Sequence, residues 1–319
     1  LCATWSAVQG LLDGLQAVCR KGKTLVICDE HHHAAVEAAW GEGANGAFSD
    51  AKYAIILTGT PIRSDGKESV WLAYDDQGLI DQHSAGTYTL TYGEAVDLNY
   101  CRPITFHRHE GKFSVKLQDG ENISVSGLEK TSLAGLKKIK GLQQALDYYK
   151  LACTPKYLPN KKADPLSYQA SLLECCISKL SDPRMRMPDA GGLVIAPNIT
   201  VAEYMAELLE ILDGEKPTIV HNQVSNPEGK ITAFRNSKKR WIVSVAMISE
   251  GVDIPRLRVL AYLPNAQTEL SFRQSVGRVV RNYGPKDDTR AYVVMPTHRT
   301  FEEYARRVEN EMSSGARQQ

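Results

Sequence analysis

The sequence predicts an α/β protein with parallel sheets flanked by helices. Between residues 167 and 311, short apolar runs alternate with amphipathic stretches of helical length, as in repeated βαβ units. Near the N-terminus, the apolar runs at residues 25–28 and 51–57 end abruptly in polar residues, as buried parallel strands do. At 319 residues, the chain is long enough for two domains of this kind.

Composition and charge indicate a globular protein without a strongly basic surface. The formal net charge is +1, so any nucleic acid would have to bind in a local basic groove. No apolar run approaches the roughly 20 residues of a membrane span, and no secretory leader is visible, so we expect a cytoplasmic protein with no membrane partner. Seven cysteines without a C-x-x-C pair indicate reduced thiols. The first residue is Leu1, which suggests a fragment.

The first part of the chain alternates less regularly. A helix at 34–40 and a flexible glycine-rich loop at 41–46 are expected after the first strand. Short strands at 88–90 and 102–106 are expected on either side of a helix at 92–97.

We place the boundary between the two domains near Leu98, giving domains 1–98 and 99–319. Residues 110–165 form a lysine-rich insertion in the second domain. This insertion either faces nucleic acid or, as we favour, presents a solvated helical face. The second domain is expected to contain strands at 192–197, 218–221, 241–246, 258–263 and 290–295, and helices at 167–180, 201–212, 228–234, 270–280 and 301–311.

Two adjacent carboxylates, Asp29 and Glu30, stand where the first apolar run ends. The carboxyl ends of strands in an open α/β sheet form the ligand crevice. One carboxylate there can bind a divalent cation while its neighbour orients or deprotonates a water molecule. The alternative is an ordinary strand end followed by a solvated turn.

Four segments resemble the motifs of one enzyme family. Asp29-Glu30-His31-His32 resembles motif II, in its D-E-x-H form, of the superfamily 2 helicases and translocases. Residues 57–63 resemble motif III, residues 247–255 resemble motif V, and residues 274–281 resemble motif VI. The motifs occur in the order of the family and span nearly the whole chain. The third consecutive histidine and the segment at 34–40 look most like the res-subunit group of the type III restriction enzymes.

The resemblance implies two RecA-like domains, the first truncated at its N-terminus, with ATP and Mg²⁺ held in the cleft between them. Asp29 would reach the metal directly or through water, and Glu30 would position the attacking water. His32 and Gln274 would sense closure of the cleft.

Motifs III and V supply further candidate residues. By resemblance, Thr58 and Thr60 couple the nucleotide to the second domain, although an ordinary strand-to-turn transition explains them as well. Gly251 allows close approach of the backbone, and Asp253 can accept a hydrogen bond from a sugar hydroxyl. Ser249 could contact a phosphate. The alternative for motif V is an ordinary glycine turn.

Motif VI places Gln274, Gly277, Arg278 and Arg281 at positions i, i+3, i+4 and i+7. This spacing predicts that all four lie on one face of a helix, with two guanidinium groups on the same surface. By resemblance, Arg278 and Arg281 are arginine fingers that neutralise charge on the transferring γ-phosphoryl group. The alternative is a salt-bridged surface helix.

Three polar residues are candidates for contact with nucleic acid. Thr4 and Ser6 resemble hydroxyl residues that touch the nucleic-acid backbone ahead of motif II, but capping of a helix explains them equally well. Asn198 resembles the backbone-contacting position of motif IV, and a turn-forming asparagine after Pro197 is the alternative.

A phosphate-binding loop is missing ahead of motif II. Such a loop requires a strand, a glycine-rich turn and then a helix. Gly22-Lys23-Thr24 mimics the end of a Walker A sequence, but Ala17 stands where the first glycine belongs and the tripeptide leads into a strand. We therefore interpret it as a turn. Either the loop lies on a further segment, or this chain does not hydrolyse ATP.

These observations favour an ATP-dependent DNA helicase or translocase, with nuclease or methylase partner subunits. An RNA remodelling helicase is one alternative, and a nucleic-acid or partner-binding module without ATPase activity is another. A metal site built from the three consecutive histidines is disfavoured, because they cannot all converge on one ion and no cysteine spacing supports it.

Overall fold

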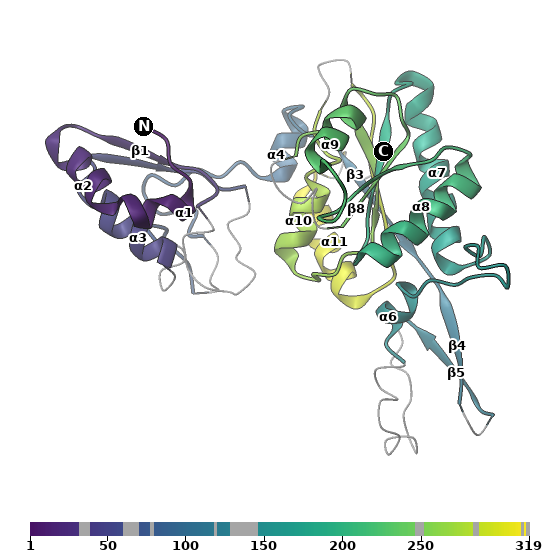
Figure 1. Cartoon of the computed structure of the whole chain (residues 1–319). Helices are drawn as coiled ribbons and strands as arrows, with labels where there is room; N and C mark the ends of the chain where they lie inside the picture. The colour runs from purple at the N-terminus through teal and green to yellow at the C-terminus, as the bar shows by residue number, and fades with distance from the viewer. Residues whose placement is uncertain are drawn as a thin grey trace. The chain divides into compact units, whose positions relative to one another are not determined.

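The computed structural model describes residues 1–31, 39–59, 70–76, 80–117, 120–127, 146–245, 252–282, 287–313 and 316. The chain divides into two compact units (Figure 1). Unit 1 comprises Leu1–Thr89 with Thr268–Arg273, and unit 2 comprises Leu90–Gln267 with Gln274–Gln319. The domain boundary expected near Leu98 remains a prediction.

Unit 1 contains a parallel pair of strands with short helices on one side of it (Figure 1). Strands β1 (Leu25–Cys28) and β2 (Tyr53–Ile56) pair in parallel, which confirms the two strands expected there. The expectation that both are buried was wrong, because the pair is covered on one side and Leu25, Ile27, Tyr53 and Ile55 are exposed. A small apolar core of Val8, Leu15 and Ala47 is buried between the helices. These helices are α1 (Trp5–Val8), the 3₁₀ helix η1 (Gln9–Leu11), α2 (Leu12–Lys21) and α3 (Ala39–Phe48).

The glycine-rich segment at 41–46 is helical, so its prediction as a flexible loop was wrong. It forms most of α3, and its glycines lie where that helix meets the first helices of the chain. A Cβ atom added to Gly46 would lie 2.9 Å from a methyl carbon of Leu12, and one added to Gly43 would lie 3.6 Å from Gln9. The missing side chain of Gly46 therefore permits close packing on Leu12, whereas 3.6 Å at Gly43 is an ordinary contact. Packing of α3 on the earlier helices outweighs the low helix propensity of glycine. The strand predicted at 88–90 is also wrong, since these residues belong to no strand.

Unit 2 contains a six-stranded parallel sheet in the order β3-β10-β9-β6-β8-β7. Its central strands are buried along their whole length, as apolar runs covered on both faces should be. The expected alternation of strands and helices is therefore confirmed. The strands are β3 (Ile104–His109), β6 (Gly191–Ile195), β7 (Thr218–Val220), β8 (Trp241–Ser244), β9 (Leu257–Tyr262) and β10 (Ala291–Pro296).

Helices flank this sheet on both sides (Figure 1). Helices α7 (Tyr168–Arg186) and α8 (Ile199–Asp213) bury their apolar faces against it in the main core. None of the described helices is both long enough and apolar enough to cross a membrane. The other helices, apart from one in the insertion, are α4 (Tyr92–Asp97), α9 (Pro227–Arg235), α10 (Glu269–Val276) and α11 (Arg299–Glu311).

The insertion begins with an antiparallel hairpin rather than a helix. Its strands are β4 (Lys112–Lys116) and β5 (Asn122–Ser126), and helix α6 (Tyr148–Ala152) follows. Val125 and Tyr148 join the hairpin and α6 through a small core. Residues 128–145, which include four of the lysines of the insertion, lie outside the described residues.

Candidate functional site

The carboxylates of motif II stand at the end of β1, as the sequence predicts. Both Asp29 and Glu30 are exposed. Glu30 has a φ of 49°, and its backbone N–H donates to a carboxylate oxygen of Asp29 at 3.0 Å. The indole N–H of Trp5 donates to the backbone carbonyl of Asp29 at 2.8 Å. The strand therefore ends in a tight turn that displays two carboxylates, and an exposed Asp29 suits the partly hydrated coordination that Mg²⁺ prefers.

His31, the next residue, is buried and has a structural role. Its Nε2 lies 2.5 Å from the carbonyl oxygen of Val70, and its ring stacks on Trp71 with centroids 5.9 Å apart. Burial lowers the pKa of His31. His32 and the third histidine lie outside the described residues. Among the described residues, no group of three or more histidine, cysteine or acidic side chains could hold a metal ion.

Motif III is hydrogen-bonded to the turn of motif II. The backbone N–H of Leu57 donates to Cys28 O at 2.8 Å, and the backbone N–H of His31 donates to Leu57 O at 3.0 Å. Thr58 is the next residue after this link. Its role in coupling stays a prediction. Thr60 lies outside the described residues.

The segment Gly22-Lys23-Thr24 connects a helix to a strand. Helix α2 ends at Lys21 and β1 begins at Leu25, while the hydroxyl of Thr24 donates back to Val18 O at 3.3 Å. A phosphate-binding loop has the opposite order, because it connects a strand to the N-terminus of a helix. The interpretation of this segment as a turn is therefore confirmed.

Motif VI does not form the continuous helix that its spacing predicted. Helix α10 carries Gln274 but ends at Val276, and the next three residues form a turn. Arg281 instead forms an isolated antiparallel bridge with Cys101. The prediction of one helix face bearing both arginines was therefore wrong. The physical reason is a hydrogen bond of 2.7 Å from the backbone N–H of Arg102 to Val280 O, which draws this segment into an extended conformation.

Both arginines of motif VI nevertheless reach motif V. Arg281 Nη1 lies 2.7 Å from Asp253 Oδ1, and both side chains are about half exposed. Arg278 Nη1 donates to the backbone carbonyl of Val252 at 2.8 Å. Two candidate residues, Arg281 and Asp253, are thus brought into direct contact. Ser249 and Gly251 lie outside the described residues.

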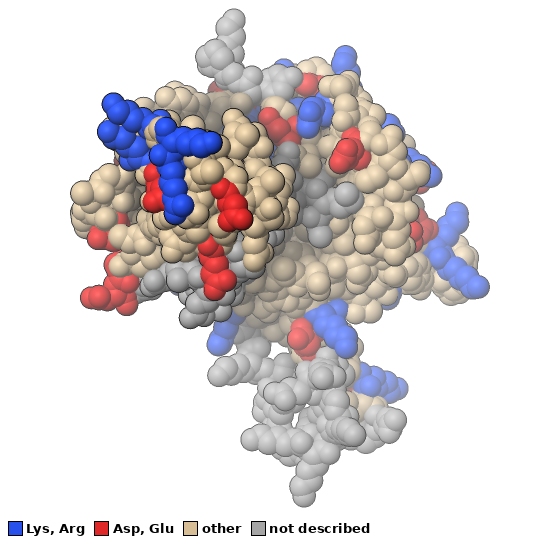
Figure 2. Space-filling model, turned by 60° about the vertical axis from the view of Figure 1, so that its left-hand side comes forward, with Lys and Arg blue, Asp and Glu red and all other residues tan. Residues whose placement is uncertain are grey.

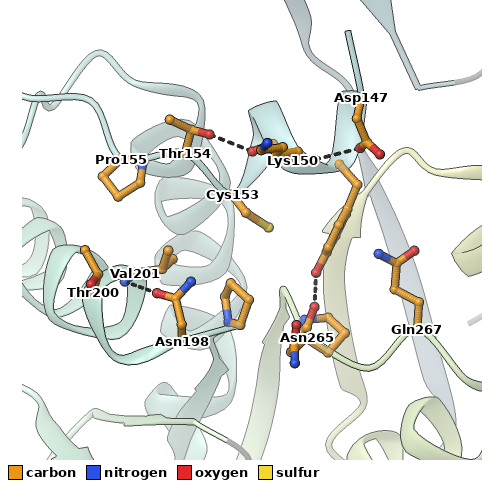
Figure 3. Close-up of a pocket in the computed structure, with 13 residues that line it drawn as sticks. Asp147, Lys150, Cys153, Thr154, Pro155, Asn198, Thr200, Val201, Asn265 and Gln267 are labelled. Atoms are coloured by element: carbon orange, nitrogen blue, oxygen red, sulfur yellow. Dashed lines mark hydrogen bonds between the residues drawn. The ribbon is translucent and has the colours of Figure 1, made fainter. Parts of the chain in front are cut away.

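Asn198 has a clear local role and also lines a cavity. Its side-chain oxygen accepts a hydrogen bond from the backbone N–H of Val201 at 2.9 Å, so it caps helix α8. The cavity measures about 580 Å³ and lies beyond the carboxyl ends of β6 and β9 (Figure 3). The polar side chains that line it include Asp147, Lys150, Cys153, Asn198, Thr200, Asn265 and Gln267.

The chemistry of this cavity suits a phosphodiester backbone. Amide, hydroxyl and ammonium groups can donate to phosphate oxygens, and the N-terminus of a helix favours an anion. Burial raises the pKa of Cys153 to about 11, so its thiol is neutral. Asp147 is the one acidic side chain of the described lining, and its carboxylate opposes an anion while it accepts from the backbone N–H of Lys150 at 2.9 Å. Elsewhere, the face shown in Figure 2 carries both basic and acidic side chains, in keeping with the small net charge.

Thr4 and Ser6, the other nucleic-acid candidates, are exposed and bonded to each other. Their hydroxyl oxygens are 3.1 Å apart. Thr4 occupies the N-cap position of α1, although its side chain makes no capping hydrogen bond. The hydroxyls therefore remain accessible.

Sequence reasoning missed the importance of Arg102. This side chain is buried, and its Nε donates to the backbone carbonyl of Arg281 at 3.1 Å. The signal that was available is an arginine followed by Pro103 at the beginning of the strand expected at 102–106.

Part of unit 2 matches a known protein family. Residues 173–283, which include Asn198 and motifs V and VI, match the family model of the helicase conserved C-terminal domain. Over these residues the chain is similar to a helicase C-terminal domain. The matched residues account for most of the parallel sheet of unit 2 and for both candidate arginines.

Relatives of the helicase domain extend the similarity over most of the chain. An uncharacterised protein of Mycobacterium leprae is 33% identical over 273 residues, which cover 85% of this chain and 42% of that protein. A protein of the Sulfolobus islandicus filamentous virus that is named as a candidate helicase is 27% identical over 266 residues, covering 81% of this chain and 40% of that protein. The chain therefore spans about two-fifths of the length of these relatives.

A solved structure shows the same fold. A fragment of an HsdR-type subunit of a type I restriction enzyme from Vibrio vulnificus matches with a TM-score of 0.56 at 14% identity. The match covers 94% of this chain and 48% of that chain. The α/β fold with parallel sheets flanked by helices is thus confirmed.

Proposed function

We propose that this chain is part of an ATP-dependent helicase or translocase that moves along nucleic acid, with DNA as the favoured track. The observation that carries the proposal is the contact between motifs V and VI in the helicase C-terminal domain. There, Arg281 pairs with Asp253, and Arg278 binds the carbonyl of Val252. This arrangement places two guanidinium groups beside a segment expected to bind nucleotide.

The ion pair between Arg281 and Asp253 is weak enough for Arg281 to exchange it for a bond to a phosphate group. Exposed ion pairs contribute only about 0–1 kcal/mol to stability. A phosphate offers a guanidinium group two parallel charge-assisted hydrogen bonds, which are stronger. Arg281 can therefore leave Asp253 for the γ-phosphate of ATP at little cost, and Asp253 becomes available to accept from the ribose.

The remaining roles follow from the motifs. Asp29 would hold the Mg²⁺ of the nucleotide directly or through water, and Glu30 would orient the attacking water. The metal, when bound, neutralises charge on the phosphate oxygens. Gln274 and His32 respond to the bound nucleotide, and Thr58 and Thr60 relay its state.

Nucleic acid is proposed to bind through its backbone. Asn198 with Lys150 and Thr200 forms the binding surface at the cavity of unit 2. Thr4 and Ser6 of unit 1, and Ser249, are separate candidates for hydroxyl donors. Contacts of this kind give little sequence specificity and a marked dependence on salt. DNA is favoured over RNA because the motifs resemble a restriction-enzyme group, and the fold resembles a restriction subunit. Nuclease or methylase subunits are the proposed partners.

The test is the nucleic-acid-stimulated ATPase activity of the intact protein. We expect Glu30→Gln and Arg281→Ala each to abolish turnover while the thermal unfolding temperature is unchanged. Asp288→Asn is the control, because its surface ion pair with Arg186 lies outside the proposed machinery. Full turnover in either variant would reject the assignment of the site.

Two alternatives make different predictions. The first alternative is a module that binds nucleic acid without hydrolysis. Titration of nucleotide against this chain and against the intact protein separates that alternative from a motor. Filter binding with matched DNA and RNA strands separates a DNA motor from an RNA remodelling helicase.

A further inference from the structure

Two buried arginines of unit 2 share one carboxylate. Arg102 Nη2 lies 2.7 Å from Asp287 Oδ2, and Arg258 Nη2 lies 2.6 Å from the same oxygen. The three side chains are between 0% and 3% exposed. Replacement of such buried ion pairs by apolar residues is often neutral or even stabilising. Stability alone is therefore a weak explanation for this cluster.

Arg102 holds the end of motif VI at several points. Its backbone N–H donates to Val280 O at 2.7 Å, and its Nε donates to Arg281 O at 3.1 Å. Its Nη2 also donates to Arg281 O. Cys101, the preceding residue, bridges Arg281. The backbone of Arg281 is thus fixed by Cys101 and Arg102, which lie just before β3.

Arg258 holds the end of motif V in a similar way. Its Nη1 donates to Pro255 O at 2.6 Å and to Leu257 O at 2.8 Å. Pro255 is the last residue of the segment that resembles motif V, two residues after Asp253. Thr289 completes the cluster, because its hydroxyl oxygen accepts from Arg258 Nε at 2.8 Å and its N–H donates to Asp287 at 3.1 Å.

The charge state of Asp287 suits it to this position. Burial raises the pKa of this carboxyl group, but hydrogen bonds from Arg102 and Thr289 and the charge of Arg258 lower it to about 2. Asp287 therefore stays ionised and binds both rigid guanidinium groups.

We propose that Asp287 is a positioning residue that fixes motifs V and VI relative to each other. Through Arg102 it sets the backbone of Arg281, and through Arg258 it sets the backbone that leads from Asp253. The 2.7 Å contact between Arg281 and Asp253 is the result of this arrangement. The catalytic consequence rests on the function proposed above, because it requires Arg281 to act on the nucleotide.

The experiment compares Asp287→Asn with Asp288→Asn in the intact protein. Asp288 is the adjacent residue, and its 2.6 Å pair with Arg186 is exposed. We expect Asp287→Asn to lower kcat of the ATPase about a hundredfold with a smaller change in KM, since small misplacements of a catalytic group cost about this much. Asp288→Asn should leave both constants unchanged.

A double-mutant cycle tests whether Asp287 acts through Arg281. In a background of Arg281→Lys, which keeps a cation at this position, the further change Asp287→Asn should lower kcat by much less than it does in the wild type. Independent effects that multiply would overturn the proposal, as would full kcat in a folded Asp287→Asn protein. Should Asp287→Asn fail to fold, Arg102→Lys takes its place, because it keeps the charge but removes the fork that binds Arg281 O.

A structural readout separates this proposal from the proposed function. The side-chain Nε–Hε resonance of Arg281 should shift in Asp287→Asn and stay in place in Asp288→Asn. Normal ATPase turnover in Arg281→Ala would refute the proposed function, whereas an unshifted Arg281 resonance in Asp287→Asn would refute the positioning role.

Discussion

Arg281 and Asp253, which belong to different motifs, form an ion pair of 2.7 Å on the surface of unit 2. Their contact depends on residues distant in sequence, since the backbone of Arg281 is bound by Arg102. Arg281 is expected to bind a phosphate group of the nucleotide, and Asp253 is expected to bind its sugar. Because both side chains are about half exposed, substitutions here should leave the fold intact.

Asp253→Asn should weaken the binding of the nucleotide sugar without destabilising the fold. We expect the free energy of unfolding in urea to change by less than about 1 kcal/mol, because the pair is exposed. The intact protein should lose its preference for ATP over 2′,3′-dideoxy-ATP, because the acceptor for the ribose hydroxyl is weakened. A preference that persists in the variant would exclude the ribose contact.

Replacing Asn198 by aspartate should preserve the cap of helix α8 but weaken the binding of nucleic acid. Asn198→Asp keeps an oxygen that accepts from Val201 N–H, so the thermal unfolding temperature should stay close to that of the wild type. The added negative charge should weaken binding of single-stranded DNA, measured by fluorescence anisotropy at several salt concentrations. Asn198→Ala is the comparison, and it should cost about 1 kcal/mol of stability through loss of the cap. Unchanged DNA affinity in Asn198→Asp would remove this residue from the binding surface.

His109 should make the fold sensitive to acid. Burial, together with the nearby His107, lowers the pKa of His109 from 6.5 to about 4. The unfolded chain therefore binds this proton more readily, so its contribution to stability is complete above about pH 6.5 and is lost as the pH falls toward about 4. His109→Gln should reduce the slope of unfolding free energy against pH in that window.

His83→Gln is the control for this slope, because His83 is exposed. Part of the slope should persist in His109→Gln, since burial also lowers the pKa of His31 and of His298. A slope equal to that of the wild type would show that His109 does not control acid stability.

Gly192→Ala should destabilise unit 2. A Cβ atom at this position would lie 2.1 Å from the ring of Trp241, which is fully buried. Overpacking of this kind costs about 1–3 kcal/mol, measured by urea unfolding. Gly14→Ala is the matched control in helix α2, where an added Cβ meets nothing within 4 Å, and it should stabilise by about 0.5–1 kcal/mol. Equal stability of the two variants would contradict the packing around Trp241.

Local sequence patterns predicted much of the fold correctly. The apolar runs that became β6 and β9 are strands because a continuous run of this length has to be covered on both faces. The run that became β1 is also a strand, although Leu25 and Ile27 remain exposed on it. The helix at Tyr92–Asp97 has the predicted bounds, and its capping box of Thr91 and Glu94 lies within four residues of sequence. The position of Asp29 and Glu30 at the end of a strand follows from the same local rule.

Contacts between residues distant in sequence decided the features of the fold that local patterns predicted wrongly. The glycines at 41–46 are helical because α3 packs closely on earlier helices, a constraint that propensity does not contain. Motif VI leaves its helix at Val276 because Arg102, far from it in the chain, binds Val280 and Arg281. The sequence by itself thus determined which residues form strands and which carry the candidate chemistry. Only the tertiary structure decided how Arg281 meets Asp253, because that geometry depends on buried hydrogen bonds between segments that no local pattern relates.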